Sequence, residues 1–278
     1  MMSPSLLLLL ALAILVVPWW LMPRRPGPRP EIHGLLRVLW WINAAYCALM
    51  HRLEAGGPAP LPEQGPAILI ANHTCGIDHM ILQAGCQRVL GFMIAQEFYN
   101  WWPCRPFCKL LDCISVKRDG HDVAATRAAL RALKQGRVVP IFPEGRITPR
   151  SGLVIAEGKP GAAFIALHAR VPVIPAYICG TPPTNDVLKS LVTPSNAKVI
   201  YGPPIALEPD EFPEPFDKAT LAAATDRLMA AILALRAKAM AGEEHGRAGM
   251  PASPEPDDRR PERHLDAVPA DRPALVTA

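Results

Sequence analysis

Short apolar runs that alternate with helical patterns constrain this chain more than any other sequence feature. Six of these runs are AILIA (67–71), GFMIA (91–95), CISV (113–116), VVPIF (138–142), VPVIPAYI (171–178) and AKVIY (197–201). Continuous apolar runs of this length, bounded by turn residues, are typical of buried strands. Their alternation with helices predicts an α/β sandwich with a largely parallel central sheet.

Amphipathic patterns predict the helices. The clearest covers 122–135, where Gly136 is placed to end it, and an alanine-rich helix is predicted at about 218–240. Their apolar stripes consist of Val123, Thr126, Leu130 and Leu133 in the first helix, and of Leu221, Leu228, Ile232 and Leu235 in the second.

Composition limits the function classes. Half of the residues are hydrophobic and 19% are charged, which excludes intrinsic disorder for most of the chain. The net charge of +4 is too small to indicate a nucleic-acid binder, and an apolar, slightly basic chain fits a membrane surface better. Seven cysteines at irregular spacings argue against a disulfide framework and favour a reducing compartment.

The N-terminal segment predicts a membrane anchor. No charged side chain occurs in 1–23, and its apolar part is long enough to cross most of a hydrocarbon layer of roughly 30 Å. A cleaved signal peptide is the alternative, but it lacks a basic start and a small-residue cleavage site. Arg24, Arg25 and Arg29 follow, so the positive-inside rule places the rest of the chain in the cytoplasm, attached to the inner membrane.

The segment 24–56 is interpreted as a basic, proline-rich exit followed by an interfacial helix. Its apolar part, 35–50, contains Arg37 and Asn43 and is too short to span a membrane comfortably. We expect a helix that lies in the interface or packs against the domain, with Trp40, Trp41 and Tyr46 at the level of the lipid headgroups. An ordinary buried helix is the alternative.

The remaining chain divides into a folded part and a tail. The predicted strands and helices place one domain at 57–242. From residue 243 to 278 the chain is rich in Pro, Asp, Arg and Glu with few large apolar side chains, which predicts a disordered tail.

The first group of residues suited to chemistry follows the predicted strand 67–71. It reads Asn72-His73-Thr74-Cys75-Gly76-Ile77-Asp78. The carboxyl end of a strand is where α/β folds usually place catalytic groups. His73 and Asp78 can meet only if the chain turns before the helix begins, which Gly76 makes easy. Asp78 would then hold one ring nitrogen and leave the other as a base; taken alone, the pair could equally be structural.

The second group follows the predicted strand 138–142 and reads Phe142-Pro143-Glu144-Gly145-Arg146-Ile147-Thr148. The carboxylate and the guanidinium can point into one cleft, and the planar fork of Arg suits a phosphate. Arg118, with Lys117 beside it, ends another predicted strand. Each of these groups could also be a solvated surface turn.

Four blocks together are more specific. NHTCGID, the VKR at 116–118, FPEGRIT and the VPVIPA at 171–176 occur in the order and spacing of the glycerolipid acyltransferases. Over about residues 35–210 the chain resembles this lysophosphatidic acid acyltransferase (PlsC-like) family. The resemblance implies a membrane-associated α/β enzyme with an N-terminal helical anchor, whose domain at 57–242 is the acyltransferase domain. The family transfers a fatty acyl group from a thioester to a glycerophospholipid hydroxyl.

The resemblance also implies roles for individual residues. His73 would be the base that takes the proton of the acceptor hydroxyl, and Asp78 its orienting partner. The substrate-binding residues would be Asn72, Arg118, Glu144, Gly145, Arg146 and Pro175. No cofactor is implied, because acyl-CoA or acyl-carrier protein, as co-substrate, already carries an activated acyl group. The expected partners are therefore a lysophospholipid acceptor, an acyl thioester and membrane lipids, without nucleic acid.

The sequence departs from the family at FPEGRIT, where many members have Thr-Arg-Ser after Glu-Gly. This variant is similar to the acyltransferase half of bacterial lysophosphatidylethanolamine reacylating enzymes. Lysophosphatidic acid is the expected acceptor; lysophosphatidylethanolamine or a lyso-aminolipid is the alternative. A non-catalytic lipid-binding protein is the rival from another class, and intact His73 and Asp78 argue against it.

Other chemistries have weaker support. Cys75 lies between His73 and Asp78 and could form a covalent intermediate, although a free cysteine is usually a small apolar filler. Cys104, Cys108 and Cys113 lack the spacing of a zinc site, so we expect no metal. The sequence has no nucleophile elbow, P-loop or HExxH motif.

Overall fold

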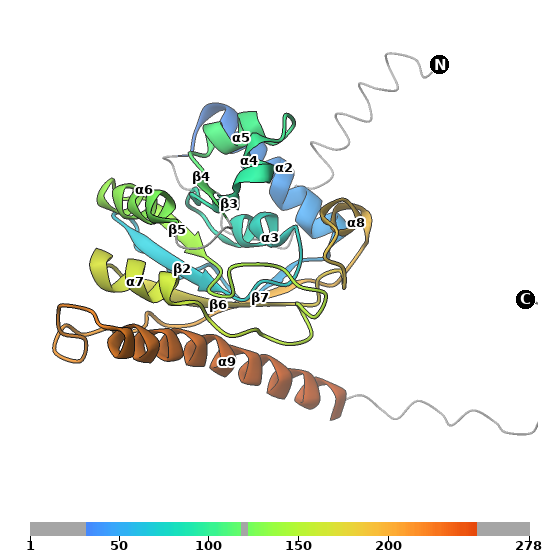
Figure 1. Ribbon diagram of the computed structural model, residues 1–278. Helices are drawn as coiled ribbons and strands as arrows, with labels where there is room; N and C mark the ends of the chain where they lie inside the picture. The colour runs from blue at the N-terminus through green and yellow to red at the C-terminus, as the bar shows by residue number, and fades with distance from the viewer. Residues whose placement is uncertain (1–31, 118–121, 249–278) are drawn as a thin grey trace, which may run out of the picture.

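The computed structural model (Figure 1) describes residues 32–117 and 122–248. The strands are β1 (Glu54–Ala55), β2 (Ala67–Ala71), β3 (Met93–Ala95), β4 (Ile114–Val116), β5 (Val138–Ile141), β6 (Val173–Cys179) and β7 (Lys198–Tyr201). The helices are α2 (Gly34–Met50), α3 (Asp78–Gly85), α4 (Gln96–Asn100), α5 (Arg105–Leu110), α6 (Val123–Lys134), α7 (Pro160–Ala169), α8 (Val187–Val192) and α9 (Lys218–Ala248).

The central sheet is mixed and mostly parallel. Its strand order is β1-β7-β6-β2-β5, and only the β6–β7 pairing is antiparallel. The expected α/β fold is therefore present, but β7 and its parallel neighbour β1 run opposite to the other three strands. The apolar pattern of 197–201 could not reveal this reversal. The runs at 91–95 and 113–116 contain β3 and β4, which form a separate parallel ladder. At the start of the first run, the Gly91 amide donates a hydrogen bond of 2.9 Å to the Val138 carbonyl of β5.

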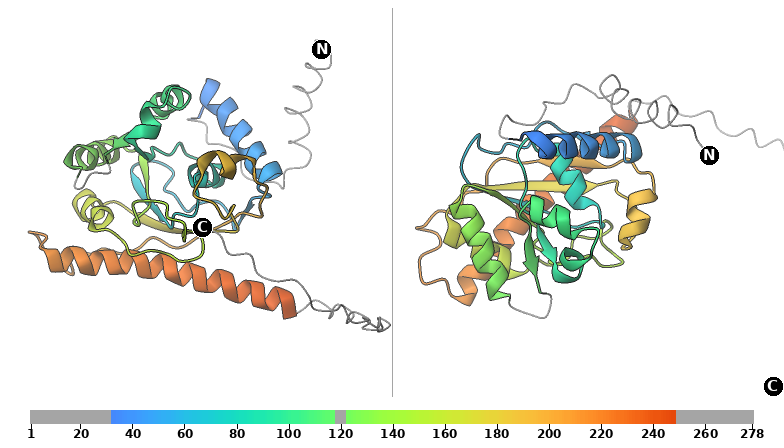
Figure 2. Two further views of the ribbon diagram at one scale, coloured as in Figure 1. Left: turned by 45° about the vertical axis from the view of Figure 1, so that its right-hand side comes forward. Right: turned by 90° about the horizontal axis from the view of Figure 1, so that it is seen from above.

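Two apolar cores lie on opposite faces of the sheet, and β2 contributes to both. Ile68 and Ile70 pack with α6, α7 and α9, whereas Leu69 belongs to the core that includes α3. This alternation follows from the period of two residues along a strand. Figures 1 and 2 show the result, with α9 on one side of the sheet and α2, α3, α4 and α5 on the other.

Helix α6 confirms the helix predicted at 122–135. The side chain of Asp122 accepts a hydrogen bond of 2.9 Å from the amide of Ala125, and Gly136 has a φ of +78° just beyond the end. The buried stripe differs from the predicted one: it consists of Ala125, Ala129, Ala132 and Leu133, while Val123 is exposed. The helix packs close to the sheet, and small alanine side chains permit this approach.

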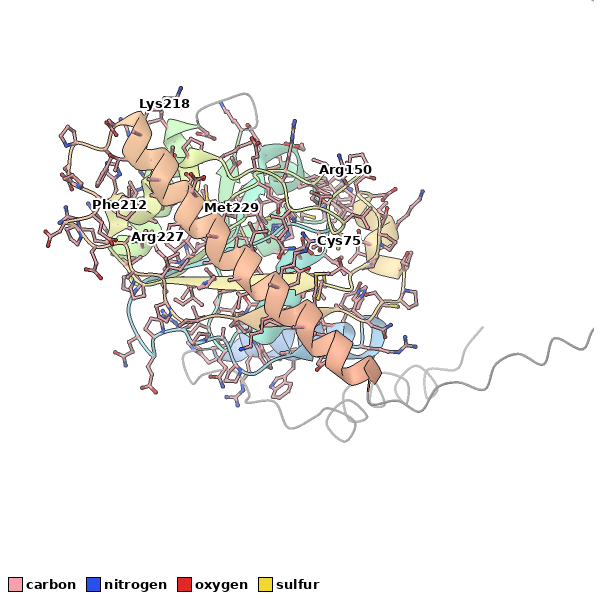
Figure 3. All side chains as sticks on the ribbon, turned by 90° about the horizontal axis from the view of Figure 1, so that it is seen from below. Cys75, Arg150, Phe212, Lys218, Arg227 and Met229 are labelled. Atoms are coloured by element: carbon pink, nitrogen blue, oxygen red, sulfur yellow. The ribbon has the colours of Figure 1, made fainter. Side chains whose placement is uncertain are left out.

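Helix α9 is longer than the helix predicted at 218–240 and crosses one side of the domain (Figure 3). It continues to Ala248 and so includes the first residues of the segment expected to be disordered; 249–278 lies outside the described residues. Its buried stripe contains Leu228 and Ile232. Gly158 lies against Met229 so closely that a Cβ there would come within 2.7 Å of the Met229 side chain.

Helix α2 packs against the domain through one face. Trp40 is buried and donates a hydrogen bond of 2.9 Å from Nε1 to the carbonyl of Cys86. The expectation that Trp40 lies at headgroup level is therefore wrong, because this indole fills the space between α2 and the domain. The hydroxyl of Tyr46 donates to the carbonyl of Leu191 at 2.6 Å. The apolar side chains left exposed on α2 are Leu35, Val38, Ile42 and Leu49.

None of the helices within 32–117 and 122–248 has the length and apolar character needed to cross a membrane. The anchor predicted at 1–23 lies outside the described residues.

Candidate active site

The turn after β2 brings His73 and Asp78 together. The chain leaves the strand at Ala71, and α3 begins only at Asp78, so the intervening residues are free to turn. His73 Nδ1 lies 2.6 Å from Asp78 Oδ2. Gly76 serves a different purpose from the one expected, since a Cβ there would lie 2.8 Å from Val187 of α8.

Asp78 is fully buried, and donors from three residues hold its carboxylate, among them the Cys75 thiol at 3.6 Å. Besides His73, the amide of Thr74 donates at 2.5 Å, the hydroxyl of Thr74 at 2.5 Å and the amide of Cys75 at 3.0 Å. Burial alone would raise the pKa of Asp78, but the hydrogen bonds from His73 and Thr74 outweigh it and hold the pKa below its usual value. Asp78 is therefore an anion suited to orient and stabilise a protonated imidazole.

Aromatic rings fix the plane of the His73 ring. Phe142 stacks on it with ring centroids 4.1 Å apart and an angle of 10° between the planes. His79 contacts the same ring edge-on, with ring centroids 5.8 Å apart. Burial lowers the pKa of His79 to about 4, so His79 is neutral at pH 7.

Within the described residues, His73 Nε2 has no hydrogen-bond partner, and the His73 side chain retains a small exposed surface. The arrangement leaves Nε2 available as a base.

Glu144 holds the backbone of His73 in place. One carboxylate oxygen accepts a hydrogen bond of 2.7 Å from the His73 amide, and the other accepts one of 2.9 Å from the Ala156 amide. The side chain is 3% exposed, and burial raises the pKa of its carboxyl. Both carboxylate oxygens therefore accept hydrogen bonds from backbone amides, which is a positioning role. The structure does not show the substrate contact that the resemblance implies for Glu144.

Replacing Glu144 with Gln tests this positioning. The amide group of Gln keeps one acceptor oxygen but turns an NH2 toward one of the two backbone donors. We expect a loss of about 1–3 kcal/mol in stability and a lower kcat with little change in the KM of either substrate. The matched control is Glu157→Gln, at an exposed position in the same loop. Unchanged kcat and stability in Glu144→Gln would contradict the positioning role.

Arg146 is exposed and free. Among the described residues its guanidinium has no hydrogen-bond or ion-pair partner, and it follows Gly145, whose φ is +72°. A Cβ at Gly145 would lie 3.0 Å from Nζ of Lys159, so this ammonium passes close to the Glu144–Arg146 turn. An unpartnered cation of this kind is suited to an anionic substrate group.

Asn72 and Pro175 are built into the sheet. The side-chain amide of Asn72 donates to the carbonyl of Ile178 at 2.9 Å and accepts from its amide at 2.7 Å. Pro175 is buried in β6, opposite Ile70 of β2. Asn72 therefore fixes the end of β2 against β6, and neither side chain is placed among the exposed groups of the site.

Arg118 lies outside the described residues. The residue before it, Lys117, is exposed, and its amide donates a hydrogen bond of 2.7 Å to Asp122.

Cys75 is buried, and burial raises the pKa of its thiol to about 12. Because thiolate is the nucleophilic form, this thiol is poorly suited to covalent catalysis at neutral pH. We expect Cys75→Ala to retain nearly full kcat, measured beside an unfolding curve that reports on the lost packing. A folded but inactive Cys75→Ala protein, together with an acyl-thioester adduct trapped on the wild type, would contradict this.

Several neighbours of His73 and Asp78 escaped the sequence reasoning. Thr74 supplies two of the hydrogen bonds to Asp78 and receives one of 2.8 Å from the hydroxyl of Thr181. Phe142 belongs to the second motif and His79 directly follows the first, but the motifs alone gave neither residue a role. The contacts of these rings with His73 depend on the pairing of β2 with β5. The spacing of the motifs along the sequence does not reveal this pairing. In the part of the chain that the structure describes, no cluster of His, Cys, Asp and Glu could hold a metal ion.

Comparison with known proteins identifies the class. Residues 52–179 match the model of the acyltransferase family. A probable 1-acyl-sn-glycerol-3-phosphate acyltransferase of Mycoplasma pneumoniae is 29% identical over 159 residues, which cover 54% of this chain and 56% of the relative. The 1-acyl-sn-glycerol-3-phosphate acyltransferase of Bacillus subtilis is 27% identical over 170 residues, covering 60% of this chain and 80% of the relative.

A solved structure shares the fold. The crystal structure of the 1-acyl-sn-glycerophosphate acyltransferase PlsC from Thermotoga maritima aligns with a TM-score of 0.56 at 19% identity, covering 82% of this chain and 89% of that one. Among the curated relatives, the matched region spans 56% of the Mycoplasma pneumoniae protein and 38% of an uncharacterized Mycobacterium bovis protein.

Proposed function

We propose that this protein transfers a fatty acyl group from acyl-CoA or acyl-carrier protein to the free hydroxyl of lysophosphatidic acid, giving phosphatidic acid. The observation that supports it most is the buried His73–Asp78 pair, with Nδ1 and Oδ2 2.6 Å apart and Nε2 left without a described partner. The match of residues 52–179 to the acyltransferase family and the relatives named for this reaction support the same assignment.

The reaction needs one base and no covalent intermediate. His73 Nε2 takes the proton of the acceptor hydroxyl as the oxygen attacks the thioester carbonyl. The new C–O bond forms, the C–S bond breaks, and the proton passes from the imidazolium to the departing thiolate. Asp78 stabilises the imidazolium between these two steps, while Arg146 binds the acceptor phosphate from the neighbouring loop.

Mass spectrometry of the products tests the proposal. Full-length protein in membranes is given a mixture of lysophosphatidic acid, lysophosphatidylethanolamine and lyso-aminolipid with acyl-CoA and acyl-carrier protein thioesters. We expect phosphatidic acid as the main product, and its loss in membranes that carry His73→Ala. A diacyl phosphatidylethanolamine or an acylated aminolipid as the main product would overturn the acceptor assignment. No His73-dependent product would overturn the enzymatic assignment in favour of lipid binding.

We also propose that the protein is bound to the cytoplasmic membrane, with 1–23 as its anchor and the acyltransferase domain on the cytoplasmic side. The support is the uncharged N-terminal segment followed by Arg24, Arg25 and Arg29. Protease added to intact spheroplasts should leave the domain uncut. Digestion of the domain there would overturn this orientation.

A further inference from the structure

The segment 101–110 exposes an unusual amount of apolar surface. Four of its side chains are largely in solvent: Trp101 is 42% exposed, Trp102 81%, Phe107 51% and Leu110 39%. We call these four residues the tryptophan patch. They lie on α5 and on the turn between α4 and α5, and Cys108 is the only buried residue of the two helices.

The exposure of the patch is not explained by the fold. Trp40 differs from Trp102 in both exposure and bonding. Trp40 is only 6% exposed, and its Nε1 donates a hydrogen bond to the carbonyl of Cys86. A tryptophan buries roughly 150–250 Å² when it is enclosed, so leaving Trp102 in water forfeits a large stabilisation. Large apolar side chains exposed together on one short segment indicate a surface that contacts another molecule.

The charges around the patch indicate an anionic partner. Residues 101–111 contain two cations, Arg105 and Lys109, and no acidic side chain, while Glu97 and Asp112 lie outside this segment. Both cations line a shallow cavity of about 480 Å³, together with Asn100, Trp102 and Pro106. An indole ring beside cations is the combination that suits the headgroup region, where the ring sits among the headgroups and the cations meet phosphates.

The position of the patch fits the same partner. Figures 1 and 2 show α4 and α5 on the same side of the sheet as α2, away from α9. Helix α2 also exposes apolar side chains, at Leu35, Val38, Ile42 and Leu49. Two elements on one side of the domain thus present apolar groups, as expected for a side that rests on a lipid surface.

We propose that the tryptophan patch inserts into the headgroup region of a bilayer that contains anionic phospholipids, with Arg105 and Lys109 on the lipid phosphates. This contact is a second attachment, made by the folded domain itself and separate from the segment 1–23. It would hold the domain against the surface in which a lysolipid acceptor resides. It does not depend on which lysolipid is acylated, or on whether acyl transfer occurs.

The test is the fluorescence of Trp102 in full-length protein on vesicles of phosphatidylcholine and phosphatidylglycerol. Subtracting the emission of Trp102→Phe from that of the wild type isolates the emission of Trp102. We expect blue-shifted emission, most of which is lost when the lipids carry brominated acyl chains and which aqueous iodide does not quench. A Trp102 signal that iodide quenches and brominated lipid leaves unchanged would overturn the proposal.

Two further variants make the result specific. Leu233→Trp places an indole at an exposed position of α9, on the other side of the domain, and its added emission should respond to iodide and not to brominated lipid. In Arg105→Gln/Lys109→Gln, quenching of Trp102 by brominated lipid should weaken. If Trp102 is shielded from both quenchers, the patch faces protein, such as a second copy of the chain, and the bilayer assignment is wrong. These readouts need no turnover, so they are independent of the proposed reaction.

Discussion

His73→Ala is expected to lower kcat by at least about a hundredfold, equivalent to roughly 2.7 kcal/mol of transition-state stabilisation. Without the imidazole, neither Glu144 nor Cys75 can take the proton from the acceptor hydroxyl, because both Glu144 oxygens accept from backbone amides and the Cys75 thiol is protonated. The KM values should change little, because the ring acts on the reacting hydroxyl and not on the lipid phosphate. The measurement is steady-state kinetics in membranes with matched protein levels.

Asp78→Asn should follow the same pattern. The substitution removes the negative charge that stabilises the imidazolium, and the Asn NH2 cannot accept the hydrogen bonds that Thr74 and Cys75 now donate. The expected loss in kcat is smaller than that of His73→Ala, because the base is still present. An unfolding curve must accompany the assay, since Asp78 is fully buried. Wild-type kcat in a folded His73→Ala protein would remove His73 from the chemistry.

Arg146→Ala is expected to cost about 2–4 kcal/mol in kcat/KM, roughly 30-fold to 1000-fold, when lysophosphatidic acid is the acceptor. The loss follows from a charged phosphate that no longer has its guanidinium partner. Arg146→Lys keeps the charge but not the planar fork, so the KM for the lysolipid should rise while the KM for the thioester stays constant.

The acceptor headgroup provides an internal control for Arg146. A phosphate monoester carries nearly two negative charges at neutral pH, whereas the phosphodiester of lysophosphatidylethanolamine carries one. Losing a cation should therefore penalise lysophosphatidic acid more. Arg131→Ala, at an exposed position near the end of α6, should leave both activities unchanged. An equal loss on both lysolipids, or a loss confined to the thioester, would remove Arg146 from the phosphate site.

Local patterns in the sequence sufficed to predict the elements of the core. Strands such as 67–71 and 138–142 are continuous apolar runs, and α6 has both its cap at Asp122 and its stop at Gly136 in the sequence. The meeting of His73 and Asp78 was also predictable, because the constraint on their spacing is local. Both residues lie within one turn of chain, so no knowledge of distant contacts was needed.

Contacts between distant segments could not be predicted in this way. The antiparallel pairing of β7 depends on the path of the chain from 180 to 197, and the burial of Trp40 depends on where α2 meets α3. Glu144 illustrates the same limit within the site, because its carboxylate binds an amide 71 residues earlier in the chain. The Pro-Glu-Gly-Arg motif places a carboxylate at Glu144, but it does not reveal which groups this carboxylate contacts.

The amide of Asn72 makes catalysis depend on the alignment of two strands. Asn72 can bond both the N–H and the C=O of Ile178 only when Ala71 stands opposite Ala176. A slip of one residue would turn Ile68 and Ile70 to the wrong face and would also withdraw these two bonds. Asn72, whose bonds require this register, directly precedes His73, the proposed base. A shift of β2 against β6 would therefore also displace His73.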